Sequence, residues 1–171
     1  DDECATIIAR RQPTASDLRL VIAIIKVNTD LERIGDEAAK VARQAVRISE
    51  AGSSPSNFVE VRHIGSRVGD MLRQSLDAFA RLDVEQAIAV VKDDKAVDKE
   101  YGSAMRSLVT FMMEDPRDIS VILNEMWALR SLERIGDHAC NIAEHLVYLV
   151  RGLDVRHGRL EDLDQYIEEE H

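Results

Sequence analysis

The sequence predicts an all-α protein of tandem three-helix bundles, for three reasons. Its 171 residues contain only eight Gly and three Pro, and the prolines stand far apart at positions 13, 55 and 116. The long stretches between them are rich in Ala, Leu, Arg and Glu, which favour helices, whereas a β-sandwich needs a turn about every 8–12 residues. A six-residue motif also occurs twice, which indicates a duplicated helical unit.

The predicted helices span residues 1–11, 16–50, 55–82, 83–114 and 116–151. Proline cannot continue a helix but is favoured at the first helical position, so the three prolines mark one helix end and two helix starts. Ser16 is the expected cap of the second helix. Asp83 with Gln86 three residues later forms a capping box that opens the fourth.

The repeat divides the chain. Leu-Glu-Arg-Ile-Gly-Asp occupies positions 31–36 and recurs unchanged at positions 132–137. The second copy is preceded by two further helices, whereas only part of one precedes the first copy. We therefore expect residues 1–52 to be the remnant of a first three-helix unit that lacks its first helix. Residues 53–152 form a complete second unit, and residues 153–171 a polar, acidic tail.

Charge and composition exclude several classes of protein. With 22 basic and 32 acidic residues the net charge is −10, which disfavours binding to nucleic acid or to an anionic membrane surface. The longest apolar run, residues 20–25, is far shorter than the roughly 20 residues that cross a bilayer. Cys4 and Cys140 follow no apolar leader, so we expect reduced thiols in a cytoplasmic protein that reaches the membrane only through partners.

The repeated motif carries a pair of carboxylates. Glu32 and Asp36, like Glu133 and Asp137, are four residues apart and therefore lie on one face of a helix. Like charges at this spacing and a glycine inside a helix are both destabilising, which predicts a compensating interaction in both copies. In the first copy the pair also continues a stripe that is apolar upstream, at Leu18, Val21, Ile22 and Ile25.

A metal or oxyanion-related site is the interpretation that we favour. Carboxylates alone make a hard oxygen site, suited to Mg²⁺, Mn²⁺ or ferric iron. Further ligands would come from Asp94 and Asp98, on the helix expected to pack against the second motif helix, and from Asp1 at the matching position of the first unit. The alternative is salt bridging to arginines, and the lysines beside Asp94 fit a solvated charge run equally well.

Weaker candidates remain. Glu60 and His63 have the Glu-x-x-His spacing of ferritin-like di-iron bundles, but the only other instance is Glu168 with His171, at the end of the chain. His138 is expected at the surface or between helices, and Cys140 in the core. No Gly-rich phosphate loop, nucleophile elbow or catalytic triad is recognisable, so we expect no enzyme. The remaining expected core residues are Met112, Met113, Leu123, Met126, Trp127 and Leu129.

At the repeated motif the chain resembles the PhoU family, the phosphate-specific transport system accessory and regulatory proteins. That family carries E(D)-x-x-x-D in the third helix of each of two three-helix bundles, and both copies stand here. The likeness extends over residues 9–19, 76–81, 94–101 and 112–115, and over almost the whole chain to about residue 160. Because members usually have some 220 to 240 residues, the resemblance implies a sequence shortened at its N-terminus.

The resemblance implies a cytoplasmic, non-enzymatic repressor of the phosphate regulon. Such proteins connect the phosphate ABC transporter and its ATPase to a membrane sensor histidine kinase, commonly as homodimers. Members bind iron, zinc, manganese or magnesium at the carboxylate motifs. Without the first helix, apolar faces of the first unit would be exposed, which favours oligomerisation. Carried over by position, the implied metal ligands are Glu32, Asp36 and Asp1 in the first site and Glu133, Asp137, Asp94 and Asp98 in the second.

Overall fold

The computed structural model describes residues 2–11, 13–51, 56 and 58–152. These residues form helices and connections without a strand, as the sequence predicts. Among them, no helix combines the length and the apolar character needed to cross a membrane. The elements are α1 (Asp2–Arg11), α2 (Ala15–Ala51), α3 (Val59–Arg81), α4 (Val84–Glu114), a short 3-10 helix η1 (Pro116–Asp118) and α5 (Ile119–Arg151).

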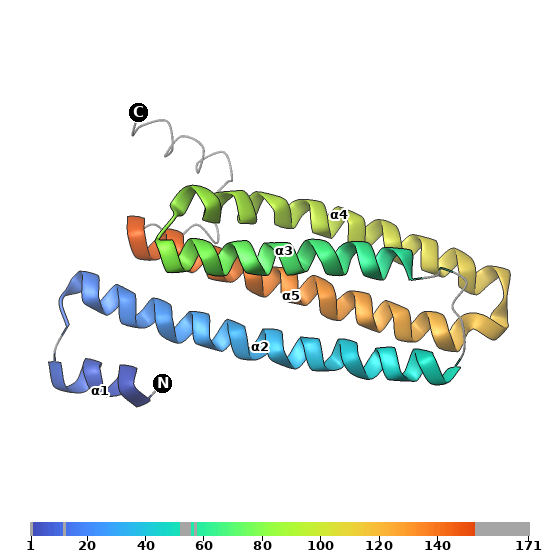
Figure 1. Cartoon of the computed structure of the whole chain (residues 1–171), viewed down its shortest axis with the longest axis horizontal. Helices are drawn as coiled ribbons and strands as arrows, with labels where there is room; N and C mark the ends of the chain where they lie inside the picture. Colours follow the sequence, from blue (N-terminus) through green and yellow to red (C-terminus); the bar gives the residue numbers. More distant parts are fainter. Residues whose placement is uncertain (1, 12, 52–55, 57, 153–171) are drawn as a thin grey trace.

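Helix α5 is the central element. It packs against α3 and α4, which also pack against each other, so that the three form a bundle (Figure 1). On the other side of α5, α2 runs antiparallel to it along much of its length, and α1 lies beside the start of α2. Among the described helices, α2 contacts α1 and α5 alone. The described structure is thus a complete three-helix bundle with one long helix laid against it.

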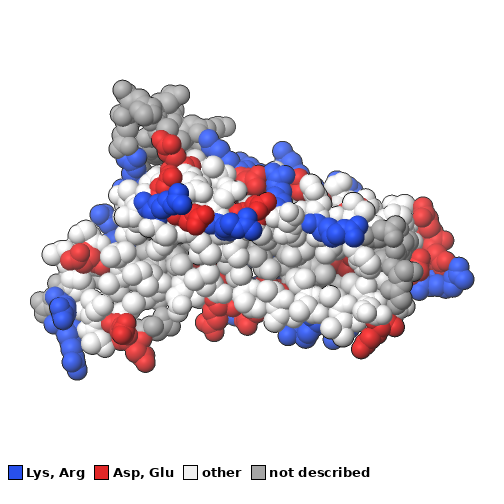
Figure 2. Space-filling model, in the orientation of Figure 1, with Lys and Arg blue, Asp and Glu red and all other residues white. Residues whose placement is uncertain are grey.

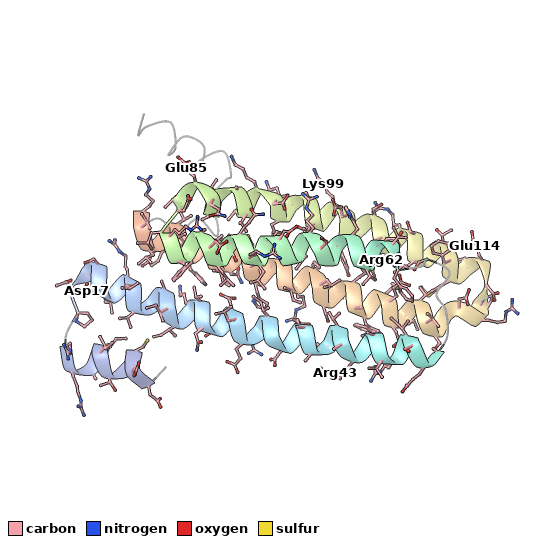
Figure 3. The ribbon with its side chains drawn as sticks, in the orientation of Figure 1. Asp17, Arg43, Arg62, Glu85, Lys99 and Glu114 are labelled. Atoms are coloured by element: carbon pink, nitrogen blue, oxygen red, sulfur yellow. The ribbon has the colours of Figure 1, made fainter. Side chains whose placement is uncertain are left out.

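The hydrophobic core lies mainly within the α3–α4–α5 bundle. Its largest side chains are less than 2% exposed, and removal of surface of this kind from water is the main force that holds helices together. Helix α2 adds Val27 and Ile34 to this core. Charged side chains such as Arg43, Glu85 and Lys99 point away from the bundle (Figure 3). The bundle's largest buried side chains include Ile64, Met71, Leu108, Ile122, Leu129, Ile142 and Leu146.

The helix ends agree with most of the sequence signals. The Asp83 carboxylate accepts a hydrogen bond from the Gln86 amide at 3.0 Å, which confirms the predicted cap of α4. At the end of α5, Gly152 has the left-handed backbone (φ 72) that glycine adopts without strain.

Two predicted helix starts are wrong, and the helix predicted from position 116 opens as the 3-10 helix η1 before α5 begins at Ile119. Ser16 lies inside α2, because Ala15 is already helical and the Leu18 amide donates to the Thr14 carbonyl at 2.8 Å. Helix α3 begins at Val59 rather than at position 55, since Phe58 has a left-handed backbone (φ 57) that a helix cannot include. Residues 52–55 and the predicted tail, 153–171, lie outside the described residues.

The two motif helices have different surroundings. Around Gly136 of α5, an added Cβ would lie 3.6 Å from Val68 of α3 and 3.8 Å from Val97 of α4, whereas around Gly35 of α2 it would meet nothing within 4 Å. Val147 is 2% exposed, but Val46, its counterpart in α2, is 58% exposed. The first motif continues a stripe that is apolar upstream, but its Glu32 and Asp36 are exposed because no described helix covers that face of α2.

Several expected core residues are also exposed. Trp127 is 61% exposed, Met113 80% and Leu123 43%, whereas Leu129 is fully buried and Met112 and Met126 are partly buried. Helical spacing places Leu123 and Trp127 on one face of α5, but that face points away from both α2 and the α3–α4 pair. Periodicity identifies the face and does not say whether a neighbour covers it.

Candidate metal centre

Three carboxylates from two helices meet beside the second motif. Asp98 of α4 and Glu133 and Asp137 of α5 each place an oxygen within 4.8 Å of the others. No other group of three His, Cys, Asp or Glu side chains comes this close among the residues that the structure describes. The sequence prediction that Asp98 belongs with the second motif is consistent with this arrangement.

Small residues and helical spacing bring these carboxylates together. Glu133 and Asp137 lie one turn apart on the side of α5 that faces α4. Between them, Gly136 has no side chain to hold α4 away, and a Cβ there would lie 3.9 Å from Asp94 Oδ1. This is an ordinary contact distance, so at Gly136 the backbone of α5 lies about one methyl group away from α4 and the Asp94 carboxylate.

Burial and mutual repulsion disfavour the charged forms of the carboxyl groups in this cluster. Burial and the nearby charges of Asp137, Asp98 and Glu144 raise the pKa of Asp94 to about 6. Burial, followed by repulsion from neighbouring carboxylates, also raises the pKa values of Glu133 and Asp137. Four carboxyl groups in one half-buried region favour protonation, unless a positive ion stabilises their charged forms.

Arginine supplies only part of that positive charge. Arg130 donates to Glu133 Oε1 at 2.7 Å, and the Glu133 side chain is only 11% exposed. Glu133 Oε2 is buried without a hydrogen-bond partner. A buried carboxylate oxygen left unpaired is costly, so this atom fits a metal ligand better than a member of a completed salt bridge.

The first motif forms no comparable cluster among the described residues. Glu32 and Asp36 are exposed on α2, and Arg33 Nη1 lies 3.9 Å from Asp36 Oδ2. Asp1, the third expected ligand of that site, lies outside the described residues. Sequence identity between the two motifs is complete, but among the described helices only α4, beside the second motif, supplies a further carboxylate to such a group.

A polar network joins the two motif helices, and it was not predicted. Asp30 of α2 is buried, with His138 Nδ1 at 2.8 Å, His145 Nε2 at 3.1 Å and the Asn141 amide at 3.2 Å, all from α5. Burial opposes ionisation of Asp30, but hydrogen bonds from His145, His138 and Asn141 outweigh it and lower the pKa. His138 is therefore an inter-helix residue, one of the two places expected for it.

The second half of this network surrounds Glu37 of α2. Its Oε1 lies 2.7 Å from Arg134 Nη1 and 2.7 Å from Lys40 Nζ, and Ser131 also hydrogen-bonds to it. Burial opposes ionisation of Glu37, and these partners lower its pKa. Asp30 is the repeat counterpart of Ser131, and Glu37 that of His138, 101 residues apart like the motifs. Shifting both members of the Asp30–His138 pair by 101 residues gives the Ser131–Glu37 pair. The repeat therefore relates the two halves of the network.

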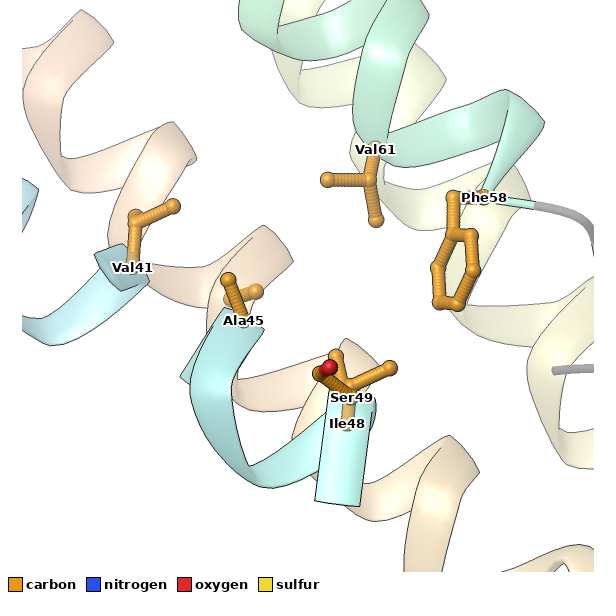
Figure 4. A pocket seen from close by; sticks show the side chains of 7 residues that line it. Val41, Ala45, Ile48, Ser49, Phe58 and Val61 are labelled. Carbon is orange, nitrogen blue, oxygen red and sulfur yellow. The ribbon is translucent and has the colours of Figure 1, made fainter. Parts of the chain in front are cut away.

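Cys140 and an apolar groove add no further metal ligand to the carboxylate cluster. Burial and the surrounding carboxylates raise the pKa of the Cys140 thiol, which suits a small core residue and not a thiolate ligand. An apolar groove of about 320 Å³ separates Val41, Ala45 and Ile48 of α2 from Phe58 and Val61 (Figure 4). Ser49 supplies the one hydroxyl of this lining, and none of the lining residues carries a charge.

The visible surface carries charges of both signs. Acidic and basic side chains alternate along the α3–α4 side, and this face shows no broad patch of Lys and Arg (Figure 2). A surface that binds a phosphate backbone is normally enriched in Lys and Arg. The view agrees with the net charge of −10 in giving no support to nucleic-acid binding.

Comparison with known proteins identifies one family. The chain matches the PhoU domain over residues 1–45 and 61–146. It is 62% identical over 168 residues to the phosphate-specific transport system accessory protein PhoU homolog of Pseudomonas aeruginosa, covering 98% of this chain and 69% of that protein. It is 45% identical over 167 residues to the PhoU protein of Escherichia coli K12, with the same shares covered.

Solved structures show the same fold. The crystal structure of PhoU from Pseudomonas aeruginosa aligns with a TM-score of 0.88 and 64% identity, over 90% of this chain and 73% of that one. The crystal structure of the phosphate transport system regulatory protein PhoU from Streptococcus pneumoniae aligns with a TM-score of 0.79 and 31% identity. This alignment covers 90% of this chain and 71% of that one. The chain thus spans roughly two thirds of the length of the relatives it matches.

Proposed function

Because the chain belongs to the PhoU family, we propose that it acts in the regulation of phosphate transport. More closely, it would repress the phosphate regulon and phosphate uptake as a metal-binding adaptor between the phosphate ABC transporter and a sensor histidine kinase. The names of its relatives, accessory and regulatory proteins of phosphate transport, support the coarser role. The carboxylate cluster with its unpaired Glu133 oxygen is the observation that supports the metal-binding part.

In this proposal the second motif holds the metal. Glu133, Asp137 and Asp98 supply carboxylate oxygens, and Asp94 lies beside them. A bound Mg²⁺, Mn²⁺, Fe or Zn ion would supply positive charge at this place. Since the ligands come from α4 and α5, ionised carboxylates at this position would then strengthen the contact between these helices instead of weakening it.

The chain is proposed to work without catalysis, through contacts. Its relatives are named accessory or regulatory proteins, which supports a role through contacts. We place it in the cytoplasm, at the inner membrane through its partners, and as a homodimer. The face of α2 that no described helix covers supports self-association.

A metal-independent scaffold is the alternative function. The ion pairs of Arg130 with Glu133 and of Arg134 with Glu37 favour it, because each satisfies part of a carboxylate without a metal. In that case the motif carboxylates would stabilise the helices through arginine alone. The two proposals differ in what a metal chelator should do to partner binding.

A capture experiment separates them. The immobilised chain is offered the transporter ATPase and the kinase's cytoplasmic part, in Mn²⁺ and in EDTA. We expect capture in Mn²⁺ and at least a tenfold loss in EDTA or in Glu133→Gln/Asp137→Asn. The control Asp77→Asn/Glu85→Gln removes two exposed carboxylates from α3 and α4 and should bind like the parent. Capture insensitive to EDTA would favour the scaffold, and no capture of either partner would contradict the adaptor role.

A further inference from the structure

A second group of potential metal ligands lies between α3 and α4. A surface hollow of about 180 Å³ is lined there by Glu60 and His63 of α3 and by Glu100, Ser103 and Ser107 of α4. Glu60 and His63 form the Glu-x-x-His pair noted in the sequence. Being three residues apart, they lie on the same face of α3, and the structure turns that face toward α4.

Two carboxylate oxygens in this hollow have no hydrogen-bond partner. Glu60 Oε2 and Glu100 Oε2 are both buried atoms, and no described group donates to either. Arg67 satisfies the other oxygen of Glu100, at 2.7 Å, and also pairs with Asp93. Buried acceptors are nearly always paired, so two unpaired carboxylate oxygens on residues that line one small hollow leave their need for a positive partner unmet.

His63 adds an imidazole nitrogen to the two carboxylates that line this hollow. His63 Nε2 lies 3.4 Å from Glu100 Oε2, within ion-pair distance but longer than a good hydrogen bond. The His63 side chain is 65% exposed, so little packing opposes its rotation. A rotation is needed, because the ligand atoms of Glu60, His63 and Glu100 do not yet form a group as close as that of Asp98, Glu133 and Asp137.

This group is separate from the carboxylate cluster on α5. Asp98 and Glu100 are two residues apart on α4, which places their side chains about 200° apart around the helix. Asp98 accordingly meets Glu133 and Asp137 of α5, whereas Glu100 meets Arg67 and His63 of α3. The two faces of α4 thus carry two independent sets of carboxylates.

We propose that Glu60, His63 and Glu100 form a second, transition-metal site, for which Zn²⁺ is the fitting ion. One imidazole and two carboxylates are common zinc ligands, and a histidine selects against Mg²⁺, which prefers oxygen and water. The Ser103 and Ser107 hydroxyls line the same hollow and leave the site polar. The site bridges α3 and α4 on the side of α4 turned away from the motif cluster.

The test uses the Glu133→Gln/Asp137→Asn protein, so that the motif cluster does not compete. Zn²⁺ is titrated calorimetrically in excess Mg²⁺, and histidine ring nitrogens are followed by NMR. We expect one Zn²⁺ site per chain that shifts the His63 ring signals, with at least tenfold weaker binding in His63→Asn and in Glu60→Gln. Circular dichroism of each variant checks that the helices are intact, which the surface position of His63 favours.

Asp77→Asn is the matched control, because Asp77 is an exposed carboxylate about four turns farther along α3 than His63. This variant should bind Zn²⁺ with unchanged affinity. Binding that survives both His63→Asn and Glu60→Gln would overturn the site, since the ion would then lie elsewhere. A His63 shift without any effect of Glu60→Gln would also overturn it, because His63 would then act alone as an ordinary surface ligand.

Discussion

Asp94 shows most clearly how single residues set the properties of the carboxylate cluster. It is half-buried, faces Asp98, Asp137 and Glu144, and has its pKa raised to about 6 by burial and by those charges. The lysines next to Asp94 in the sequence were equally consistent with a solvated run of charges and with a metal ligand. The sequence could not decide between these interpretations, because the deciding neighbours Asp137 and Glu144 belong to another helix.

The raised pKa predicts a pH dependence for the metal-free protein. Unfolding returns Asp94 to its ordinary pKa of 3.8, so between about pH 4 and pH 6 the folded state binds more protons than the unfolded state. The free energy of unfolding should therefore fall as pH rises through this window. Asp94→Asn removes this loss and should gain stability over the parent at pH 7.5 but little at pH 4.5, in urea unfolding with EDTA.

Asp77→Asn, which changes an exposed carboxylate of α3, serves as control and should show no such difference between the two pH values. If Asp94→Asn changed stability equally at pH 4.5 and 7.5, the repulsion inferred within the cluster would be absent.

Buried polar residues between the motif helices matter at the same scale. Asp30 is 8% exposed and accepts from or pairs with three side chains of α5. Asp30→Ala leaves His138 and His145 without this partner, so we expect a loss of about 2–3 kcal/mol in the free energy of unfolding. Asp36→Ala, on the exposed side of the same helix, should cost less than about 0.5 kcal/mol. Comparable losses from both variants would mean that the network does not hold α2 to α5.

Individual helices were predicted well where the signal is local. The Asp83 cap depends on side chains within one turn, and the sequence contains it completely. The start of α3 depends instead on the left-handed backbone of Phe58 and on the buried Ser56, whose hydroxyl pairs with Glu125 of α5 at 2.5 Å. A contact 69 residues away in sequence cannot be read from local spacing, so the predicted start at position 55 was wrong.

Gly35 provides a test of α2 as an element. It lies inside a helix, with open space where a Cβ would stand, so Gly35→Ala should stabilise the protein by about 0.5–1 kcal/mol through helix propensity alone. Urea unfolding followed by circular dichroism measures the change. A destabilised Gly35→Ala would show that this face of α2 is covered in solution.

Gly136→Ala is the matched change in α5. Its Cβ would lie 3.6 Å from Val68, 3.8 Å from Val97 and 3.9 Å from Asp94 Oδ1, which are ordinary contact distances. We expect it to preserve the fold but to weaken Mn²⁺ binding at least threefold, because the methyl group lies beside the cluster. Unchanged affinity in a calorimetric titration would argue against a role of Gly136 in shaping the site.

The whole molecule is the scale at which the repeat helps most and misleads most. Two identical motifs predicted two equivalent helices, and α2 and α5 do lie side by side with related inter-helix contacts. The repeat also led us to expect a metal site at each motif, but Glu133 is almost buried beside Asp98 while Glu32 is exposed. A ligand set depends on the neighbouring helices, and a motif within one helix does not contain them.

The uncovered face of α2 leads to a prediction about assembly. Ala38, Ala42 and Val46 are exposed, whereas their counterparts Ala139, Ala143 and Val147 are at most 2% exposed. We therefore expect concentration-dependent dimerisation in sedimentation velocity. Ala42→Glu should weaken it at least tenfold, because a charge would have to be buried.

Ala89→Glu places the same charge on the exposed face of α4 and should leave the dimer unchanged. A monomer at every concentration, or equal effects of the two substitutions, would show that the face of α2 takes no part in self-association.

Calorimetric titration of Mn²⁺ into the metal-free protein tests the central claim most directly. The account predicts binding at the Asp98, Glu133 and Asp137 cluster, with affinity reduced at least tenfold in Glu133→Gln/Asp137→Asn and unchanged in the control Asp77→Asn/Glu85→Gln. Absence of Mn²⁺ binding to the parent chain, or equal affinity in the parent and the motif variant, would contradict it.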